Sequence, residues 1–210
     1  MADFHARAVV FDKDGVLVDT MTMIRAAWTE WAAARGLDAG DVLASIHMTG
    51  VELVNRFAPS CDPVVELNWV AARQSGLGRS IVAFPGASEL IAELPRDRWA
   101  IVTSGRRETA TGHLHEAGLP VPDVLITAED TPRGKPDPAG YLLAAQRLGI
   151  PPGECLAVED SPAGVQAAVD AGMFVVAVTN TCGAEELTHA HAVVGSLNEV
   201  RLGLDIPLIP

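Results

Sequence analysis

The spacing of apolar residues divides the chain into two kinds of segment. Residues 7–11 form a short apolar run that ends at a pair of aspartates, a pattern typical of a buried parallel strand. From about residue 20 apolar residues recur three or four positions apart, and no convincing strand interrupts them as far as residue 75. This spacing predicts an all-helical segment with helices over 20–36, 40–57 and 63–75.

The apolar pattern changes again after residue 80, where Pro85 and Gly86 mark the start of a new helix. From there short apolar runs alternate with stretches of helical character, which implies right-handed crossovers between parallel strands. The runs that predict strands are 99–104, 124–128, 155–160, 174–179 and, more weakly, 192–197.

Together these patterns predict an α/β fold with a Rossmann-like parallel sheet and an all-helical insertion. We expect residues 1–18 and 83–210 to form the α/β core and residues 19–82 to form the insertion. The composition agrees, because 49% of the 210 residues are hydrophobic but only 5% are aromatic, so small aliphatic side chains carry the packing. Such side chains suit a sheet that is covered by helices on both faces.

Charge and cysteine content narrow the classes of function. The formal net charge of -12 repels nucleic-acid phosphate, and no basic stripe overrules it, so we expect no nucleic-acid partner. Cys61, Cys155 and Cys182 lie far apart and are expected to be reduced thiols. No apolar run is long enough for a signal peptide or a membrane span, so we expect a soluble, cytoplasmic protein with no membrane partner.

Polar residues gather where the predicted strands end. In an open parallel sheet, ligands bind at the carboxyl ends of the strands, so these residues are expected to meet. They are Asp12 and Asp14 after the first strand, the segment "TSG" (103–105) after the second, "GKPDP" (134–138) in the loop after the third and "EDSPAG" (159–164) after the fourth.

The carboxylates among these residues predict a metal site. Closely spaced carboxylates repel one another, and a divalent cation is the commonest group that offsets this repulsion. Carboxylate oxygens are also the ligands that Mg²⁺ prefers. The candidate ligands are Asp12, Asp14, Glu159 and Asp160.

The remaining residues suit an anion. Thr103 offers a hydroxyl, Ser104 and Gly105 offer backbone N–H groups at the start of a predicted helix, and Lys135 offers a positive charge. A metal ion, a lysine and backbone amides that converge on one anion indicate phosphoryl transfer. Turn or helix-cap chemistry also explains each motif by itself. Their occurrence at consecutive strand ends is what favours a phosphoryl-transfer site.

These four segments resemble, in order and spacing, the motifs of the haloacid dehalogenase (HAD) superfamily. "DKDGVLVDT" is similar to the first motif, "TSG" to the second, the lysine of "GKPDP" to the third and "EDSPAG" to the fourth. The helical insertion resembles the small helical cap of that superfamily. The resemblance implies that Asp12 is a nucleophile that forms an aspartyl-phosphate and that Asp14 is the general acid and base.

The resemblance also implies which residues hold the phosphoryl group and which hold the metal. Thr103 and Lys135 would bind phosphoryl oxygens. The implied Mg²⁺ ligands are Asp12, the backbone carbonyl of Asp14, and Asp160, with Glu159 beside them.

Within the superfamily the chain is most similar to the small sugar-phosphate and glycerol-phosphate phosphatases, in the stretch that begins "FPGASELIAEL" and in "RFAP". Relatives of β-phosphoglucomutase share "DGV…DT…RAAW", but Ile24 stands where they carry a histidine. Phosphonate-cleaving members need a cap lysine, and residues 19–82 contain none. The resemblance therefore implies a Mg²⁺-dependent phosphatase of a small sugar or polyol phosphate. A hexose-phosphate mutase and a non-catalytic metabolite-binding module are the alternatives.

Substrate choice is expected to lie in a loop between two helices of the insertion and along the helix that follows this loop. The candidates to face the substrate are His47, Thr49, Glu52 and Arg56. The alternative interpretation is a satisfied histidine followed by an ordinary helix start at Thr49. Since one such cap covers one site, we expect a monomer.

Overall fold

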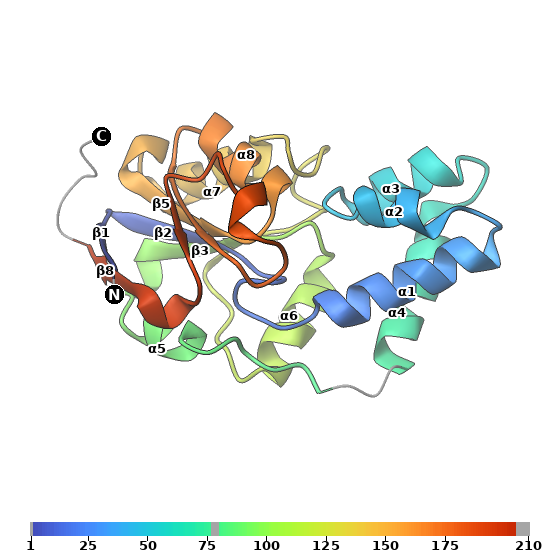
Figure 1. The fold of residues 1–210 in the computed structure, drawn as a ribbon, viewed down its shortest axis with the longest axis horizontal. Coiled ribbons are helices and arrows are strands. Elements are labelled where there is room, and N and C mark those ends of the chain that lie inside the picture. Colours follow the sequence, from blue (N-terminus) through green and yellow to red (C-terminus); the bar gives the residue numbers. More distant parts are fainter. Residues whose placement is uncertain (1, 77–79, 205–210) are drawn as a thin grey trace.

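The structure is a computed structural model that describes residues 2–76 and 80–204 (Figure 1). The predicted core and insertion also include residues 1, 77–79 and 205–210, which lie outside the described residues. Within the described part, no helix is both long and apolar enough to cross a bilayer.

A parallel sheet forms the centre of the α/β part, which confirms the predicted fold class. Its strand order is β4-β3-β2-β5-β6-β7, so the chain reverses direction across the sheet between β2 and β5. In register, Phe11 of β2 lies opposite Ile101 of β3 and Val158 of β5. The strands are β2 (Ala8–Asp12), β3 (Trp99–Val102), β4 (Val124–Ile126), β5 (Cys155–Glu159), β6 (Phe174–Val178) and β7 (Ala192–Val194).

The strands from β3 onward end earlier than the sequence predicts. The predicted strand 99–104 ends at Val102, and the predicted strand 155–160 ends at Glu159. The reason is that the polar residues which follow, such as Thr103 and Asp160, leave the strand to form the loops at the sheet edge. The prediction included these polar residues in the strands because they directly follow the apolar runs.

Helices cover both faces of the sheet, as expected for doubly wound α/β proteins. All five residues of β2 are buried, and the first four alternate between two apolar cores. Val9 and Phe11 belong to the core under α5 (Ala87–Ala92) and α6 (Arg107–Glu116), with Leu90 and Leu114. Ala8 and Val10 belong to the core under α7 (Ala139–Leu148) and α8 (Pro162–Asp170), with Tyr141 and Val165.

A second, two-stranded parallel sheet pairs β1 (Ala2–His5) with β8 (Val200–Gly203). The sequence did not predict it, because β1 has only four residues and only Phe4 among them is buried, which leaves no apolar run to detect. Short 3₁₀ helices connect other elements, over Arg96–Arg98, Pro152–Glu154, Ala184–Glu186 and Leu197–Glu199.

Four helices follow β2 and form what we call the helical insertion, α1 (Met21–Ala34), α2 (Ala39–Ala44), α3 (Gly50–Phe57) and α4 (Pro63–Gly76). In Figure 1 they lie at the end of the molecule opposite the N-terminus. They share an apolar core of their own, centred on Trp28, Trp31 and Leu53. The predicted helical stretch 40–57 contains two helices, because Thr49 and Glu52 form a capping box that starts a new helix at Gly50.

Candidate active site

The polar strand ends meet at the switch point of the sheet, between neighbouring strands β2 and β5. Asp12 is the last residue of β2, and Glu159 and Asp160 stand at the end of β5. One carboxylate oxygen from each of these three residues lies within 4.8 Å of the other two. All three side chains are buried, so the sheet edge carries a compact carboxylate cluster away from bulk water.

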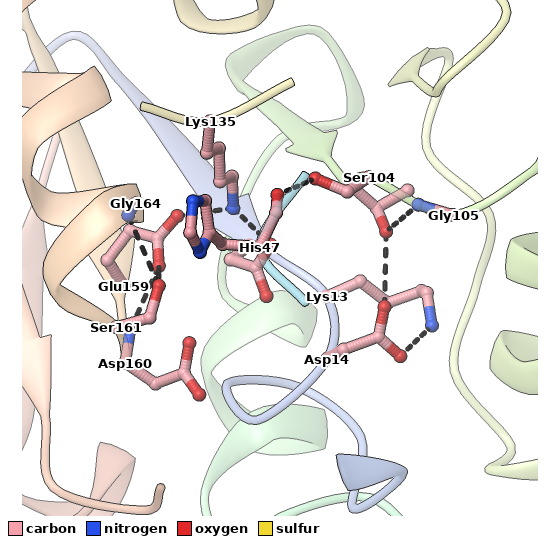
Figure 2. A network of polar contacts seen from close by, with 12 residues as sticks. Lys13, Asp14, His47, Ser104, Gly105, Lys135, Glu159, Asp160, Ser161 and Gly164 are labelled. Carbon is pink, nitrogen blue, oxygen red and sulfur yellow. Dashed lines mark hydrogen bonds and ion pairs between the residues drawn. The ribbon is translucent and has the colours of Figure 1, made fainter. Parts of the chain in front are cut away.

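Lys135 joins this cluster from the loop before α7. Its side chain is buried, and its ammonium group donates hydrogen bonds to both Asp12 Oδ1 and Glu159 Oε1. The Tyr141 hydroxyl donates to the same oxygen of Glu159. In Figure 2, Lys135 reaches toward the acidic residues, with Glu159 and Asp160 on one side and Asp14 on the other. One lysine therefore holds two carboxylates that come from different strands.

The cluster carries more negative than positive charge. Burial raises the pKa of Asp12 to about 7, and the nearby carboxylates of Glu159 and Asp14 add to the effect although Lys135 opposes it. Burial and the same kind of repulsion raise the pKa of Asp160 well above its usual range. If all three carboxylates were ionised, they would exceed the single positive charge of Lys135, and a divalent cation would supply the balance. The oxygen-only donor set fits Mg²⁺.

Hydrogen bonds and close backbone approach fix the orientation of the cluster. The Thr181 hydroxyl donates to Asp160 Oδ2 at 2.6 Å, and the Asp160 backbone N–H donates to Glu159 Oε2 at 3.1 Å. Gly15 has φ +88°, and a Cβ there would lie 1.9 Å from Asp160 Oδ2. A side chain at this position would therefore displace the carboxylate.

Gly164, in the first turn of α8, gives a prediction about the same cluster. A Cβ on Gly164 would lie 2.1 Å from the Glu159 carboxylate, which Lys135 and Tyr141 hold in place. We expect Gly164→Ala to lower the free energy of unfolding by roughly 1–3 kcal/mol, because overpacking forces the carboxylate to move. Gly112→Ala is the matched helical control, since a Cβ at Gly112 meets nothing within 4 Å. It should stabilise the protein by up to about 1 kcal/mol.

Thermal unfolding with EDTA would measure both variants. For a chain of this size a change of 1 kcal/mol shifts the Tm by about 2–4 °C. If Gly164→Ala had the same Tm as Gly112→Ala, the close approach of α8 to the Glu159 carboxylate would be refuted.

The Asp14 carboxylate lies apart from the carboxylate cluster and has its own partners. It forms an ion pair with Lys13, accepts from the Thr20 hydroxyl at 2.5 Å and accepts from the Thr103 hydroxyl at 3.1 Å. Burial opposes ionisation of Asp14, but the Lys13 ammonium and the hydrogen bond from Thr20 outweigh it and lower the pKa of Asp14. Lys13 Nζ in turn lies 3.2 Å from His113 Nδ1. The resting structure therefore favours an ionised Asp14.

The segment Thr103–Gly105 follows β3 at the same edge, but it does not open a helix as the sequence predicts. Helix α6 begins at Arg107, after an extended Arg106. The Gly105 backbone N–H donates to Thr103 Oγ1 at 3.1 Å, and the Ser104 hydroxyl donates to the His47 carbonyl of the helical insertion at 2.8 Å. The segment is thus a tight loop whose polar groups lie next to Asp14 and the insertion.

A cavity of about 980 Å³ lies between these loops and the helical insertion. Its polar end contains Asp12, Asp14 and Lys135, and its opposite wall is largely apolar. Among the insertion residues that line it are Ile24, Trp28, Leu43, His47 and Met48. The volume is at the upper end of the range for small-molecule sites.

The four insertion residues predicted to face a substrate do not share one environment. His47 lines the cavity. Thr49 and Glu52 form the capping box of α3, and Glu52 also accepts from the Gly134 backbone N–H at 2.9 Å. Arg56 lies over the Phe57 ring, with its guanidinium 3.9 Å from the Met48 sulfur.

Sequence reasoning missed several residues of this site. Lys13 was visible as a lysine between two aspartates, and its burial follows from its place at the end of a buried strand. Tyr141 is the only tyrosine in the chain, which is a weak signal. Thr20 was visible only as the last residue of the segment "DKDGVLVDT". Thr181 carries no signal, because only the folded chain brings it against Asp160.

Comparison with known proteins agrees with this arrangement. Residues 6–172 match the haloacid dehalogenase-like hydrolase family. The chain is 38% identical over 204 residues to hexitol phosphatase A of Escherichia coli (strain K12), which covers 94% of each chain. It is 38% identical over 208 residues to validoxylamine A 7'-phosphate phosphatase of Streptomyces hygroscopicus subsp. limoneus, over 93% of this chain and 96% of that protein.

A crystal structure of a hydrolase from Pseudomonas syringae superposes with a TM-score of 0.80 at 28% identity, over 91% of this chain and 94% of that one. A β-phosphoglucomutase from Clostridium difficile superposes with a TM-score of 0.79 at 26% identity, over 92% of each chain. Sequence and structure thus agree over nearly the whole chain. The chain belongs to the haloacid dehalogenase-like hydrolase family.

Proposed function

We propose that this hydrolase is a Mg²⁺-dependent phosphatase that acts on a small phosphorylated metabolite, a sugar or polyol phosphate. The observation that carries the proposal is the buried contact of Lys135 with Asp12, beside two further carboxylates, at the polar end of the cavity between the sheet loops and the helical insertion. Two relatives that are 38% identical over almost the whole chain are named as phosphatases of a hexitol and of validoxylamine A 7'-phosphate. Both names describe phosphate esters of polyhydroxylated molecules.

The proposal assigns residues 1–18 and 83–210 to a catalytic core and residues 19–82 to a cap. It is supported by the apolar core that lies within the helical insertion, while from residues 19–82 only Met23 and Ile81 belong to the buried core under α5 and α6, among the described residues. The cavity and the proposed catalytic residues all belong to a single chain. We also propose a cytoplasmic monomer as the working unit.

In the proposed reaction, Asp12 attacks phosphorus in line, so that a bond forms between its oxygen and phosphorus while the ester P–O bond breaks. Asp14 gives a proton to the leaving alkoxide and then takes a proton from the water that attacks the aspartyl-phosphate. Its lowered pKa suits the second role. For the first role Asp14 must hold a proton, which requires its contact with Lys13 to weaken when substrate is bound.

The remaining residues bind and orient the phosphoryl group in this proposal. Lys135 and the Thr103 hydroxyl face its oxygens, together with the backbone N–H groups of Ser104 and Gly105. Asp12, Glu159 and Asp160 would hold Mg²⁺ with the backbone carbonyl of Asp14, and the cation would supply positive charge toward the same oxygens. Of the insertion residues, His47 is placed to contact the substrate, since it lines the cavity.

The test is phosphate release from a panel of sugar and polyol phosphates by purified protein, with Mg²⁺ and with EDTA. We expect release that requires Mg²⁺ and falls to background with EDTA, because the carboxylate cluster lacks counter-charge without a cation. Conversion of a hexose phosphate without phosphate release would instead indicate a mutase. Binding of esters by calorimetry without any turnover would indicate a metabolite-binding module.

A further inference from the structure

One carboxylate oxygen connects the helical insertion to the loop that carries Lys135. Glu52 Oε2 accepts from the Thr49 backbone N–H at 2.9 Å and from the Thr49 hydroxyl at 2.8 Å, which completes the capping box of α3. The same oxygen accepts from the Gly134 backbone N–H at 2.9 Å. Gly134 is the residue before Lys135, so this contact crosses from the insertion to the site.

The approach at Gly134 is too close for a side chain. A Cβ there would lie 2.7 Å from the Thr49 backbone nitrogen, 3.0 Å from Glu52 Oε2 and 3.1 Å from Thr49 Cγ2. All three atoms belong to the insertion. The backbone of Gly134 does not have the left-handed conformation that disfavours other residues. Only the contact with the insertion therefore excludes an alanine at this position.

Other polar contacts also cross between the insertion and the sheet loops. The Ser104 hydroxyl donates to the His47 carbonyl, and Arg106 Nη1 donates to Asn68 Oδ1 at 2.9 Å. Neither is adjacent to Lys135. The Glu52 contact differs because it is one peptide unit from the lysine that holds Asp12 and Glu159. It is also a hydrogen bond to an ionised acceptor, which is roughly twice as strong as a neutral one.

We propose that Glu52 is a positioning residue, which fixes the Lys135 loop when the helical insertion lies over the cavity. This inference rests on the proposed phosphatase function. Closure of the insertion and placement of Lys135 would then be one event, since the Glu52–Gly134 contact exists only when the two segments meet. Glu52 acts through Gly134 and Lys135 and does not touch the reacting atoms.

Three variants separate this role from simple support of α3. Glu52→Ala removes both the capping box and the Gly134 contact. Gly134→Ala leaves the capping box intact and separates the two segments. Glu52→Gln retains an acceptor oxygen and a residue that capping boxes accept. Asn68→Ala is the control, because it removes a different contact between insertion and core.

We expect Glu52→Ala and Gly134→Ala to lower kcat by about 10-fold or more, the effect of losing a hydrogen bond to a charged group. The loss should appear in kcat more than in KM, because Lys135 stabilises charge that develops in the transition state. Glu52→Gln should lower kcat less than Glu52→Ala does, because it keeps an acceptor oxygen but not the charge, and Asn68→Ala should change kcat by less than about 3-fold. In addition, hydrogen exchange of the Gly134 amide should be at least about 10-fold faster in Glu52→Ala and Gly134→Ala.

Wild-type kcat in both Glu52→Ala and Gly134→Ala would overturn the proposal, whatever the exchange rates. An equal loss of kcat in Asn68→Ala would also overturn it, because general loosening of the insertion would then suffice. If the wild-type protein releases no phosphate from any ester, the proposed function fails, and the exchange experiment decides the contact by itself. Unchanged exchange at Gly134 in both variants would then refute it, and faster exchange would support it.

Discussion

Replacing Asp12 with asparagine is expected to abolish phosphate release without unfolding the protein. An amide of the same shape cannot serve as the attacking group, so turnover should fall by about 10,000-fold or more. The fold should survive, because Asp12 is a buried carboxylate next to two others and its ionisation is unfavourable there. Phosphate release and circular dichroism on the same preparation would measure the two effects.

The pH dependence of stability gives this prediction a second readout. The pKa of Asp12 is raised from 3.8 to about 7 in the folded protein, so between these pH values the folded state holds a proton that the unfolded state has lost. The free energy of unfolding of the metal-free wild type should therefore fall as pH rises through this window. Asp12→Asn lacks this titration, so its Tm should rise relative to wild type from pH 3.8 to 7 and then stay level.

Asp3→Asn is the matched control, since Asp3 is exposed on β1. It should leave both turnover and the pH profile unchanged. Near-wild-type turnover by Asp12→Asn, free of contaminating phosphatase, would refute the role of Asp12 in the proposed mechanism. A Tm difference that does not change with pH would refute the buried, uncompensated carboxylate.

Replacing Lys135 with methionine should have the opposite effect on stability. The ammonium of Lys135 is the buried positive charge that contacts Asp12 and Glu159, and methionine keeps the length of the side chain but not the charge. Removing one partner of a buried ion pair costs about 3–5 kcal/mol. With about 2–4 °C per kcal/mol, the Tm at neutral pH in EDTA should fall by roughly 6–20 °C. Phosphate release should also be lost.

Adding Mg²⁺ and introducing a second substitution should each reverse part of the destabilisation of Lys135→Met. Mg²⁺ should raise the Tm of Lys135→Met more than that of wild type, because the cation supplies the missing charge. The double variant Asp12→Asn with Lys135→Met should be more stable than Lys135→Met alone, since it removes one uncompensated carboxylate. A Lys135→Met protein as stable as wild type in EDTA would show that the carboxylates are not held as described.

The sheet could be predicted because its strands are buried on both faces and appear as continuous apolar runs. Residues 155–159 and 174–178 are examples, and the polar groups at strand ends pointed to the switch point. The pairing of β1 with β8 could not be predicted, since it joins short segments from the two ends of the described chain. The break at residues 45–49 between α2 and α3 agrees with the alternative interpretation of a helix start at Thr49, which forms a capping box with Glu52.

Prediction of the site was limited by long-range contacts. Asp12, Asp14, Glu159 and Asp160 follow strands, and the order of strands in a doubly wound sheet brings such residues together. The partners that tune them come from elsewhere, as with Tyr141 against Glu159 and Thr181 against Asp160. Glu52 was predicted to face a substrate, but its carboxylate binds backbone N–H groups instead. The orientation of a side chain in the first turn of a helix depends on the loop that packs against that turn.

The path of the chain into and out of the helical insertion has a consequence for how such a protein can diversify. The two crossings lie side by side, with Val18 bridged to Ala83, the Asp19 N–H donating to the Val82 carbonyl and the Phe84 N–H donating to the Leu17 carbonyl, each at 2.9 Å. For the sheet, the whole insertion is therefore equivalent to one long loop whose two ends are adjacent. Descendants could exchange or reshape the insertion and acquire new substrates while inheriting the reaction centre unchanged.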